Sequence, residues 1–204
     1  MNLYRYDIIN EFIKKYNFKN YLEIGVFDGE CIKKIICENK DGVDPGSEKG
    51  LGIGVNFNVT SDEFFEDHCT KKYDLIFIDG LHHSDQVDKD IENALTHTVD
   101  NGVIVLHDCN PPTLGHTLIP RVQVQWNGDV YKSILKFRES NSEHKIFTVD
   151  TDWGVGLIIK NQSDLTEPSN LDFQRAMNEW EYFDTNRKEL LNLITIQDFI
   201  NGKY

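Results

Sequence analysis

The sequence predicts an α/β fold, a doubly wound and mostly parallel sheet with helices on both faces and an antiparallel hairpin at its end. Strand-like and helix-like apolar patterns alternate from residue 20 to about residue 140, as in parallel strands that are joined by helices. Leu75–Ile78 form a continuous apolar run, which is typical of a strand covered on both faces. Two further strands, 145–150 and 154–160, flank a short turn and predict the hairpin.

Composition narrows the class of protein. With 204 residues, of which 39% are hydrophobic, the chain can bury a sizeable core, and we expect one domain over 1–204. The formal net charge of −13 argues against nucleic acid or an anionic membrane as a partner, because both bind cationic surfaces. The charged N-terminal residues do not resemble a signal peptide, and no apolar stretch approaches the ~20 residues that span a membrane. The four cysteines form no CxxC pair, so we expect reduced thiols in a soluble, cytoplasmic protein.

The first elements follow from apolar spacing. Residues 4–16 repeat apolar side chains at helical intervals, and a strand over 21–25 runs into a glycine turn. The spacing after this turn predicts a helix from Gly29 to about residue 39. Its apolar face would consist of Ile32, Ile35 and Ile36.

The next stretch is irregular. A short strand over 42–45 ends where Pro45 stops it, and the glycine-rich segment 46–56 is interpreted as a flexible connection. Residues 56–59 predict a third short strand, followed by a helix whose N-cap is Thr60 or Ser61.

The second half contains the strongest strand signals. The strand that includes Leu75–Ile78 ends at Asp79, and Ser84 opens an amphipathic helix. Asn101-Gly102 closes that helix, and the following strand ends at Asp108. Together with the hairpin these elements form a core over 20–160, and a C-terminal helical segment over 171–200 follows.

The turn after the first strand reads Glu23-x-Gly25-x-x-x-Gly29, with Phe27 inside it. Strand, glycine turn and helix is the arrangement that brings bare backbone against a nucleotide-like ligand. The spacing differs from the GxGxxG of dinucleotide sites, and nearby carboxylates favour a small ligand with a cationic centre over a pyrophosphate. Glycines at this position also serve tight packing alone, so the motif is weak by itself.

Acidic and polar residues follow the next two strands. Asp44 lies at the tip of the second strand, where a carboxylate can accept both hydroxyl hydrogen bonds of an adenosine ribose. Ser61 and Asp62 follow the third strand and are placed to meet an adenine, although they also suit a helix cap.

Asp79 and Asp108 end adjacent strands, so their carboxylates should converge at one mouth of the sheet. Two carboxylates that lie close together repel unless a cation or a proton relieves them, and hard oxygen ligands favour Mg²⁺ or Mn²⁺. Three histidines accompany them. His82 is our first candidate for the base that takes a proton from a substrate hydroxyl, and His83 and His107 are its rivals.

At these residues the chain resembles the class I S-adenosylmethionine (SAM)-dependent methyltransferases, over most of residues 20–160. The ExGxxxG turn, the acidic tip of the second strand and the hairpin carry the resemblance. It implies a Rossmann-like, seven-stranded sheet whose last strand is inserted antiparallel. Carried over by position, the residues that would hold SAM are Glu23, Gly25, Phe27, Gly29, Asp44, Ser61, Asp62 and Asp79.

Asp79-x-x-His82 together with His107-Asp108 resembles the metal-dependent O-methyltransferases of the macrocin type, which act on sugar hydroxyls. The resemblance implies that Asp79 and Asp108 bind the metal and that His82 is the base. His107 stands where that family has a carboxylate. Histidine is a poorer Mg²⁺ ligand, so either Mn²⁺ or another transition ion binds through Asp79, Asp108 and His107, or the metal has been lost.

We therefore expect SAM-dependent O-methylation of a small molecule or sugar unit. Trp126 and Tyr131, on an irregular segment after the fifth predicted strand, are candidates to stack on a sugar face within a substrate lid. The alternatives are an NAD(P)-dependent oxidoreductase, which ExGxxxG fits poorly, and a catalytically silent nucleotide-binding module. The terminal helices either pack on the sheet or form an interface in a homo-oligomer.

Overall fold

The computed structural model describes residues 3–46, 50, 52–140, 143–163 and 170–204. It contains one seven-stranded sheet in the order β2-β1-β3-β4-β6-β5-β7. The strands are β1 (Asn20–Ile24), β2 (Asn39–Val43), β3 (Tyr73–Ile78), β4 (Thr98–Leu106), β5 (Lys145–Val149), β6 (Val155–Ile159) and β7 (Leu193–Ile194). The pairs β1–β2, β1–β3, β3–β4 and β5–β7 are parallel, and β6 is antiparallel to both β4 and β5. The predicted α/β class and the antiparallel hairpin are therefore confirmed.

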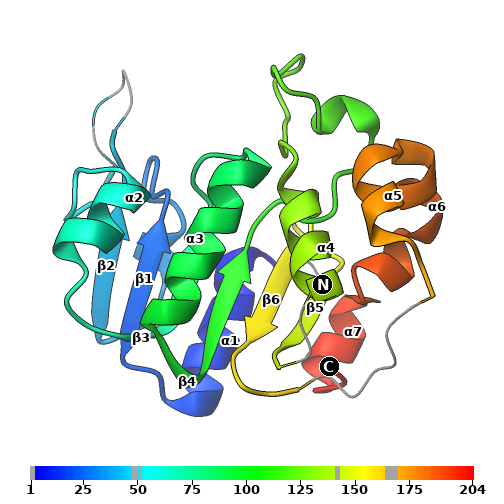
Figure 1. Cartoon of the computed structure of the whole chain (residues 1–204). Coiled ribbons are helices and arrows are strands. Elements are labelled where there is room, and N and C mark those ends of the chain that lie inside the picture. The colour runs from blue at the N-terminus through cyan, green and yellow to red at the C-terminus, as the bar shows by residue number, and fades with distance from the viewer. Residues whose placement is uncertain (1–2, 47–49, 51, 141–142, 164–169) are drawn as a thin grey trace.

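Helices cover both faces of the sheet (Figure 1). One face packs against α3 (Ser84–His97), α4 (Val130–Ser140), α5 (Phe173–Asn178) and α6 (Trp180–Leu190). The other face packs against α1 (Arg5–Tyr16) and α7 (Ile196–Ile200). Because strand side chains alternate between faces, the β3 residues Leu75 and Phe77 point to the α1 side, whereas Ile76 and Ile78 point to the α3 side. The continuous apolar run of β3 is thus explained by burial on both faces.

The predicted helix after Gly29 is wrong. The chain forms only a 3₁₀ turn at Ile32–Lys34, and Ile36 is 78% exposed. Side chains take up the backbone groups that a helix would pair internally: Lys40 Nζ donates to the carbonyl oxygens of Ile32 (2.9 Å) and Ile35 (3.1 Å). Asn10 of α1 accepts from the backbone N–H of Ile36 at 2.8 Å. These contacts to neighbouring segments override the local helical spacing.

Three other features also differ from expectation. Residues 56–59 do not form a strand, and Phe57 makes only an isolated bridge with Val43. The seventh strand is instead β7, which adds to β5, so the hairpin does not lie at the sheet edge. Asn101-Gly102 lies inside β4, where Asn101 takes a positive φ of 62° and the register with β3 shifts. The predicted cap is confirmed at Thr60, whose side chain accepts from Glu63 N at the start of the short helix α2 (Ser61–Glu63).

The glycine-rich segment 46–56 lies partly outside the described residues, but its described part packs against the first glycine turn. A Cβ at Gly52 would lie 2.0 Å from the Phe27 carbonyl oxygen, so only glycine allows this approach. The four cysteines are free. Within the described ranges, no helix has the length and apolar character needed to cross a membrane.

Candidate functional site

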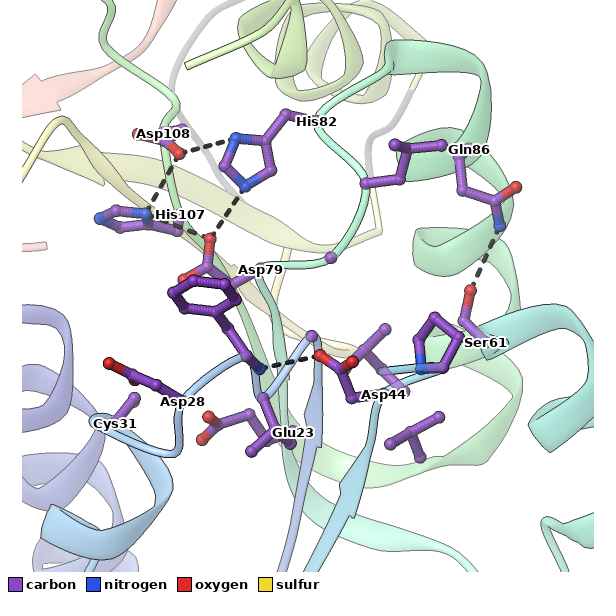
Figure 2. Close-up of a pocket in the computed structure, with 18 of the residues that line it drawn as sticks. Glu23, Asp28, Cys31, Asp44, Ser61, Asp79, His82, Gln86, His107 and Asp108 are labelled. Carbon is purple, nitrogen blue, oxygen red and sulfur yellow. Dashed lines mark hydrogen bonds and ion pairs between the residues drawn. The ribbon is translucent and has the colours of Figure 1, made fainter. Parts of the chain in front are cut away.

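A cavity of about 990 Å³ opens at the carboxyl ends of the parallel strands β1, β2, β3 and β4. One end of it is lined by the glycine turn, Asp44 and the start of α2, and the other by the residues that follow β3 and β4 (Figure 2). Backbone ladders hold the strand ends together: Asp79 N donates to Ile24 O (2.8 Å) and His107 N to Ile78 O (3.2 Å). The fold therefore brings nearly all the predicted site residues to one opening.

The glycine turn is shaped by contacts between chain segments. Gly25 has φ +85°, and a Cβ there would lie 2.2 Å from the Asp79 carbonyl oxygen. Gly29 has φ +78°, and its Cβ would lie 2.1 Å from the Ile53 carbonyl oxygen. Both glycines are thus required for packing, and Gly29 does not line the cavity. Phe27, between them, is 63% exposed at the cavity wall.

Glu23 is a buried carboxyl group at the floor of the cavity. Tyr21 donates its hydroxyl hydrogen to Glu23 Oε2, whereas Oε1 has no hydrogen-bond partner in the described part of the chain. Burial raises the pKa of Glu23 to about 7, and the Tyr21 hydrogen bond opposes this only in part. A cationic group that enters the cavity would satisfy Oε1 and restore the ionised form.

Asp44 joins the tip of β2 to the glycine turn. Its Oδ2 accepts from Phe27 N at 2.8 Å, and its Oδ1 accepts from Gly46 N at 2.7 Å (Figure 2). Each carboxylate oxygen keeps further lone-pair capacity on the cavity side. Asp44 is therefore held in place and can still accept hydrogen bonds from a ligand.

Ser61 and Asp62 line the same end of the cavity and are linked by a residue that we did not predict. Gln86 of α3 donates from Nε2 to Asp62 Oδ1 (2.8 Å) and to Ser61 Oγ (3.3 Å). Gln86 also lines the cavity. Its place on the solvent side of an amphipathic helix gave no signal in the sequence.

The other end of the cavity holds a cluster of acids and histidines (Figure 2). Asp79 Oδ1 lies 3.3 Å from both His82 Nε2 and His107 Nδ1. Asp108 Oδ2 lies 3.2 Å from His82 Nδ1 and 3.3 Å from His107 Nδ1. The contact of His82 Nδ1 lacks hydrogen-bond geometry, so this buried nitrogen has no hydrogen-bond partner among the described residues. His82 and His107 line the cavity, whereas His83 does not.

Mutual pairing sets the charges in this cluster. Burial acts to raise the pKa of Asp79, but the charge of His107 and hydrogen bonds from both histidines outweigh it and hold that pKa well below its usual range. Burial acts to lower the pKa of His107, and the carboxylates of Asp79, Asp108 and Asp152 overcome it and raise that pKa well above its usual value. The pKa of His82 is also raised, by Asp79 and Asp108 against the effect of burial.

Arg5 of α1 and Asp152 of the hairpin turn complete the cluster. Asp152, in the hairpin turn, accepts from the Arg5 backbone N (2.9 Å) and from Arg5 Nη1 (3.0 Å), so it also caps α1. Arg5 Nε lies 3.6 Å from Asp79 Oδ2, and Asp152 Oδ2 lies 3.7 Å from His107 Nε2. Three carboxylates therefore face two histidines and one guanidinium. The sequence analysis missed Arg5, because nothing local links the N-terminal helix to these strand ends.

The segment that was predicted as a substrate lid has two different environments. Tyr131 is buried and packs against Phe183 with a ring-centroid distance of 4.4 Å, so it does not reach the cavity. Trp126 lines the cavity, but its ring stacks on His82 at 5.6 Å. Trp153, in the hairpin turn, also lines the cavity and is 39% exposed.

A divalent cation fits part of the cluster. Asp79, His82 and Asp108 each offer one ligand atom, and these three atoms lie within 4.8 Å of one another. The unpartnered Nδ1 of His82 could bind a cation through its lone pair. His107, predicted as a ligand, is adjacent, with Nδ1 3.3 Å from both carboxylates. Two carboxylates with an imidazole suit Mn²⁺ or another transition ion better than Mg²⁺.

Comparison with known proteins agrees with this geometry. Residues 22–109 match the model of a family described as a methyltransferase domain. These residues include the glycine turn, Asp44 and the acid–histidine cluster up to Asp108. A search of curated proteins finds no match.

Solved structures share the fold. The O-methyltransferase TomG from Streptomyces achromogenes, in complex with SAM, is 12% identical with a TM-score of 0.55, over 78% of this chain and 80% of that one. An O-methyltransferase from Bacillus cereus in complex with SAH is 13% identical with a TM-score of 0.53, over 76% and 80% of the chains. The sugar N-methyltransferase KedS8 from Streptoalloteichus is 9% identical with a TM-score of 0.55, over 77% and 87%. These structures share the fold that the resemblance to class I SAM-dependent methyltransferases implies, and that predicted fold is therefore confirmed.

Proposed function

We propose that this protein is a SAM-dependent methyltransferase that acts on a hydroxyl group of a small molecule such as a sugar unit. The observation that supports this most is the continuity of one cavity. It joins a glycine turn with two hydrogen-bonding carboxylates at one end to a base surrounded by acids at the other. A methyl donor and a hydroxyl acceptor need this arrangement, because the reaction is an in-line displacement between two bound molecules.

In this proposal the end of the cavity at the glycine turn, here called the cofactor end, would hold SAM. The unpartnered Oε1 of Glu23 pairs with the ammonium group of the methionine half. Asp44, anchored by two backbone amides, accepts from the ribose hydroxyls. Ser61, Asp62 and Gln86 border the adenine. SAM, when bound, supplies an electrophilic methyl group on a sulfonium.

The other end of the cavity, which contains Asp79, His82, His107 and Asp108, is here called the acceptor end. In this proposal His82 acts as the base there. It lines the cavity with a side chain 21% exposed, whereas the His107 side chain is 8% exposed and contacts Arg5 and Asp152. His82 accepts the proton of the acceptor hydroxyl while that oxygen bonds to the methyl carbon and the carbon–sulfur bond breaks. Asp79 orients the imidazole and stabilises its charged form.

The sequence prediction of a metal site extends this proposal. Asp79 and Asp108 would hold Mn²⁺ or a related ion, with His107 as the nitrogen ligand, and the ion would lower the pKa of the acceptor hydroxyl. Three carboxylates are already balanced by Arg5 and two histidines with raised pKa values. Metal binding would therefore release protons and weaken at low pH.

Calorimetric titration of the purified protein with SAM and with NADH tests the cofactor. We expect SAM to bind and NADH not to bind; binding of NADH alone would favour the oxidoreductase alternative. Turnover is assayed with methyl-labelled SAM and a panel of hexoses, nucleotide sugars and catechols. SAM binding without transfer to any acceptor of a wider panel would favour the silent module. Activity that survives exhaustive chelation would remove the metal from the mechanism.

A further inference from the structure

Residues Trp126–Asp129, here called the 126–129 segment, contact the acceptor end of the cavity from outside the sheet. Asn127 is 1% exposed and Asp129 is 9% exposed, so the segment is buried despite its polar side chains. Its amides are tied to the loop before it: Asn127 N and Gly128 N both donate to His116 O, at 2.9 and 3.1 Å. The segment is therefore a fixed part of the molecule.

The 126–129 segment is hydrogen-bonded to the backbone on both sides of His83 and packs closely against it. Asp129 N donates to the His82 carbonyl oxygen at 3.2 Å. Asp129 Oδ1 accepts from Ser84 N (2.7 Å) and Oδ2 from Ser84 Oγ (2.9 Å), which caps the start of α3. Gly128 has φ +64°, and a Cβ there would lie 1.8 Å from the His82 carbonyl oxygen. Only glycine permits this approach.

Two side chains of the segment reach the acid–histidine cluster itself. The Trp126 ring stacks on the His82 ring with centroids 5.6 Å apart and planes inclined by 20°, and its Nε1 donates to Leu118 O at 2.9 Å. Arg121 lies over the same indole at 5.7 Å. The indole is thus fixed by its own contacts and limits the positions open to the imidazole.

Asn127 holds the second carboxylate. Its Nδ2 donates to Asp108 Oδ1 at 2.6 Å, and this amide orientation is set by chemistry, because a carboxylate only accepts. Asp108 has a positive φ of 61°, a backbone conformation that is costly for a residue other than glycine. The hydrogen bond therefore helps to hold Asp108 Oδ2 where it faces both histidines.

We propose that the 126–129 segment is the positioning element of the active site: Trp126 sets the plane of the His82 imidazole and Asn127 sets the Asp108 carboxylate. The proposal rests on the proposed function, in which His82 is the base. Neither residue stacks on the sugar or transfers a proton. Their removal should misplace the base while leaving the cofactor end, on other strands, intact.

The test compares Trp126→Leu, Trp126→Phe and Asn127→Ala with Val124→Ser, a matched control on the same loop whose side chain is 87% exposed. NMR of the ligand-free protein, with labelled histidine, measures the ring-current shift of the His82 ring protons. We expect a shift in the wild type that is kept in Trp126→Phe and Val124→Ser and is lost in Trp126→Leu. This readout needs neither SAM nor an acceptor, so it does not depend on the proposed reaction.

Turnover is then measured with labelled SAM and the acceptor panel. In Trp126→Leu and Asn127→Ala, kcat should fall by up to about 10²-fold while the SAM Kd stays within about twofold. Trp126→Phe should recover most of the loss. A His82 shift that is the same in wild type and Trp126→Leu, or unchanged kcat in both variants, would overturn the proposal. If the wild type transfers no methyl group, the proposed function fails, and the NMR shift alone decides the positioning role.

Discussion

The two ends of the cavity are built in different ways. The cofactor end consists of the turn after β1, the tip of β2 and the start of α2, and its main contacts are backbone amides that hold Asp44 and glycines that let segments approach. The acceptor end is made almost entirely of charged side chains. The charged side chains come from α1, the ends of β3 and β4 and the hairpin turn, and the 126–129 segment adds the neutral side chains of Trp126 and Asn127.

This difference separates binding from chemistry. At the cofactor end the polar groups are held by hydrogen bonds, and only Oε1 of Glu23 lacks a hydrogen-bond partner among the described residues, as suits a site that recognises a fixed ligand. At the acceptor end, acids and bases with displaced pKa values face one another, which is typical of a site that moves protons. We therefore expect substitutions at the two ends to have distinct effects, on turnover or on SAM affinity.

The largest effect should come from the base. His82→Ala should lower kcat by about 10²–10⁴-fold, because general base catalysis contributes this much. The SAM Kd should change by less than about twofold. His83→Ala is the matched control, because His83 is adjacent but does not line the cavity. If the two variants lost turnover equally, His82 would not be the base.

The second prediction concerns pH and Glu23. A folded-state pKa of about 7 means that ligand-free Glu23 is protonated in weak acid and ionised above pH 7. Pairing with the SAM ammonium requires the ionised form, so SAM affinity should weaken as the pH falls through about 7, by about tenfold per unit below it. Calorimetric titration with SAM between about pH 5.5 and 8.5, a range on both sides of the Glu23 pKa, measures how SAM affinity depends on pH.

Glu23→Gln is the control for that titration. The amide keeps the volume and can still accept from Tyr21, but it carries no charge. Its SAM affinity should be low at every pH and should lose the slope through pH 7. A variant with the same slope as the wild type would assign the pH dependence to another group.

A third, smaller effect concerns Arg5, whose contribution to stability should come from the acceptor end. Arg5→Gln leaves the buried carboxylates Asp152 and Asp79 without their guanidinium partner, so we expect a loss of about 1–3 kcal/mol in the free energy of unfolding. Urea denaturation measures it, with the exposed Arg175→Gln as control. An unchanged midpoint in Arg5→Gln would mean that α1 does not stabilise the acceptor end.

Much of this comparison could be predicted from the sequence. Apolar runs at the ends of β3 and β4 lead to Asp79 and Asp108, whereas the ends of β1 and β2 are marked by the glycine turn after Glu23 and by Asp44-Pro45. Parallel strands bring such ends together. Most residues of the cofactor end follow the first strands directly, so they were found from the glycine spacing, the strand ends and the family resemblance. The error after Gly29 arose because contacts with Asn10 and Lys40 replaced a helix that the local apolar spacing favoured.

The acceptor end could be predicted only in part. Its acids and histidines follow strands, but their partners do not: Arg5 meets Asp152 across almost the whole chain. Trp126 was interpreted as a surface for sugar stacking, and only the folded structure shows that its indole stacks on the His82 ring. At the cofactor end, Gln86 was missed as well, because it lies on a helix whose polar face has many similar residues. Long-range pairing of this kind leaves no periodic signal.

The most direct test of the account is a calorimetric titration of SAM into Asp44→Ala and His82→Ala beside the wild type. Asp44→Ala should weaken SAM binding by about 10²–10⁴-fold, since it removes two charge-assisted hydrogen bonds worth about 1.5–3 kcal/mol each, while His82→Ala should bind as the wild type does. Glu38→Ala, an exposed carboxylate just before β2, is the control for Asp44. Equal SAM affinity in Asp44→Ala and the wild type, or loss of binding in His82→Ala, would contradict the division of the cavity into a cofactor end and an acceptor end.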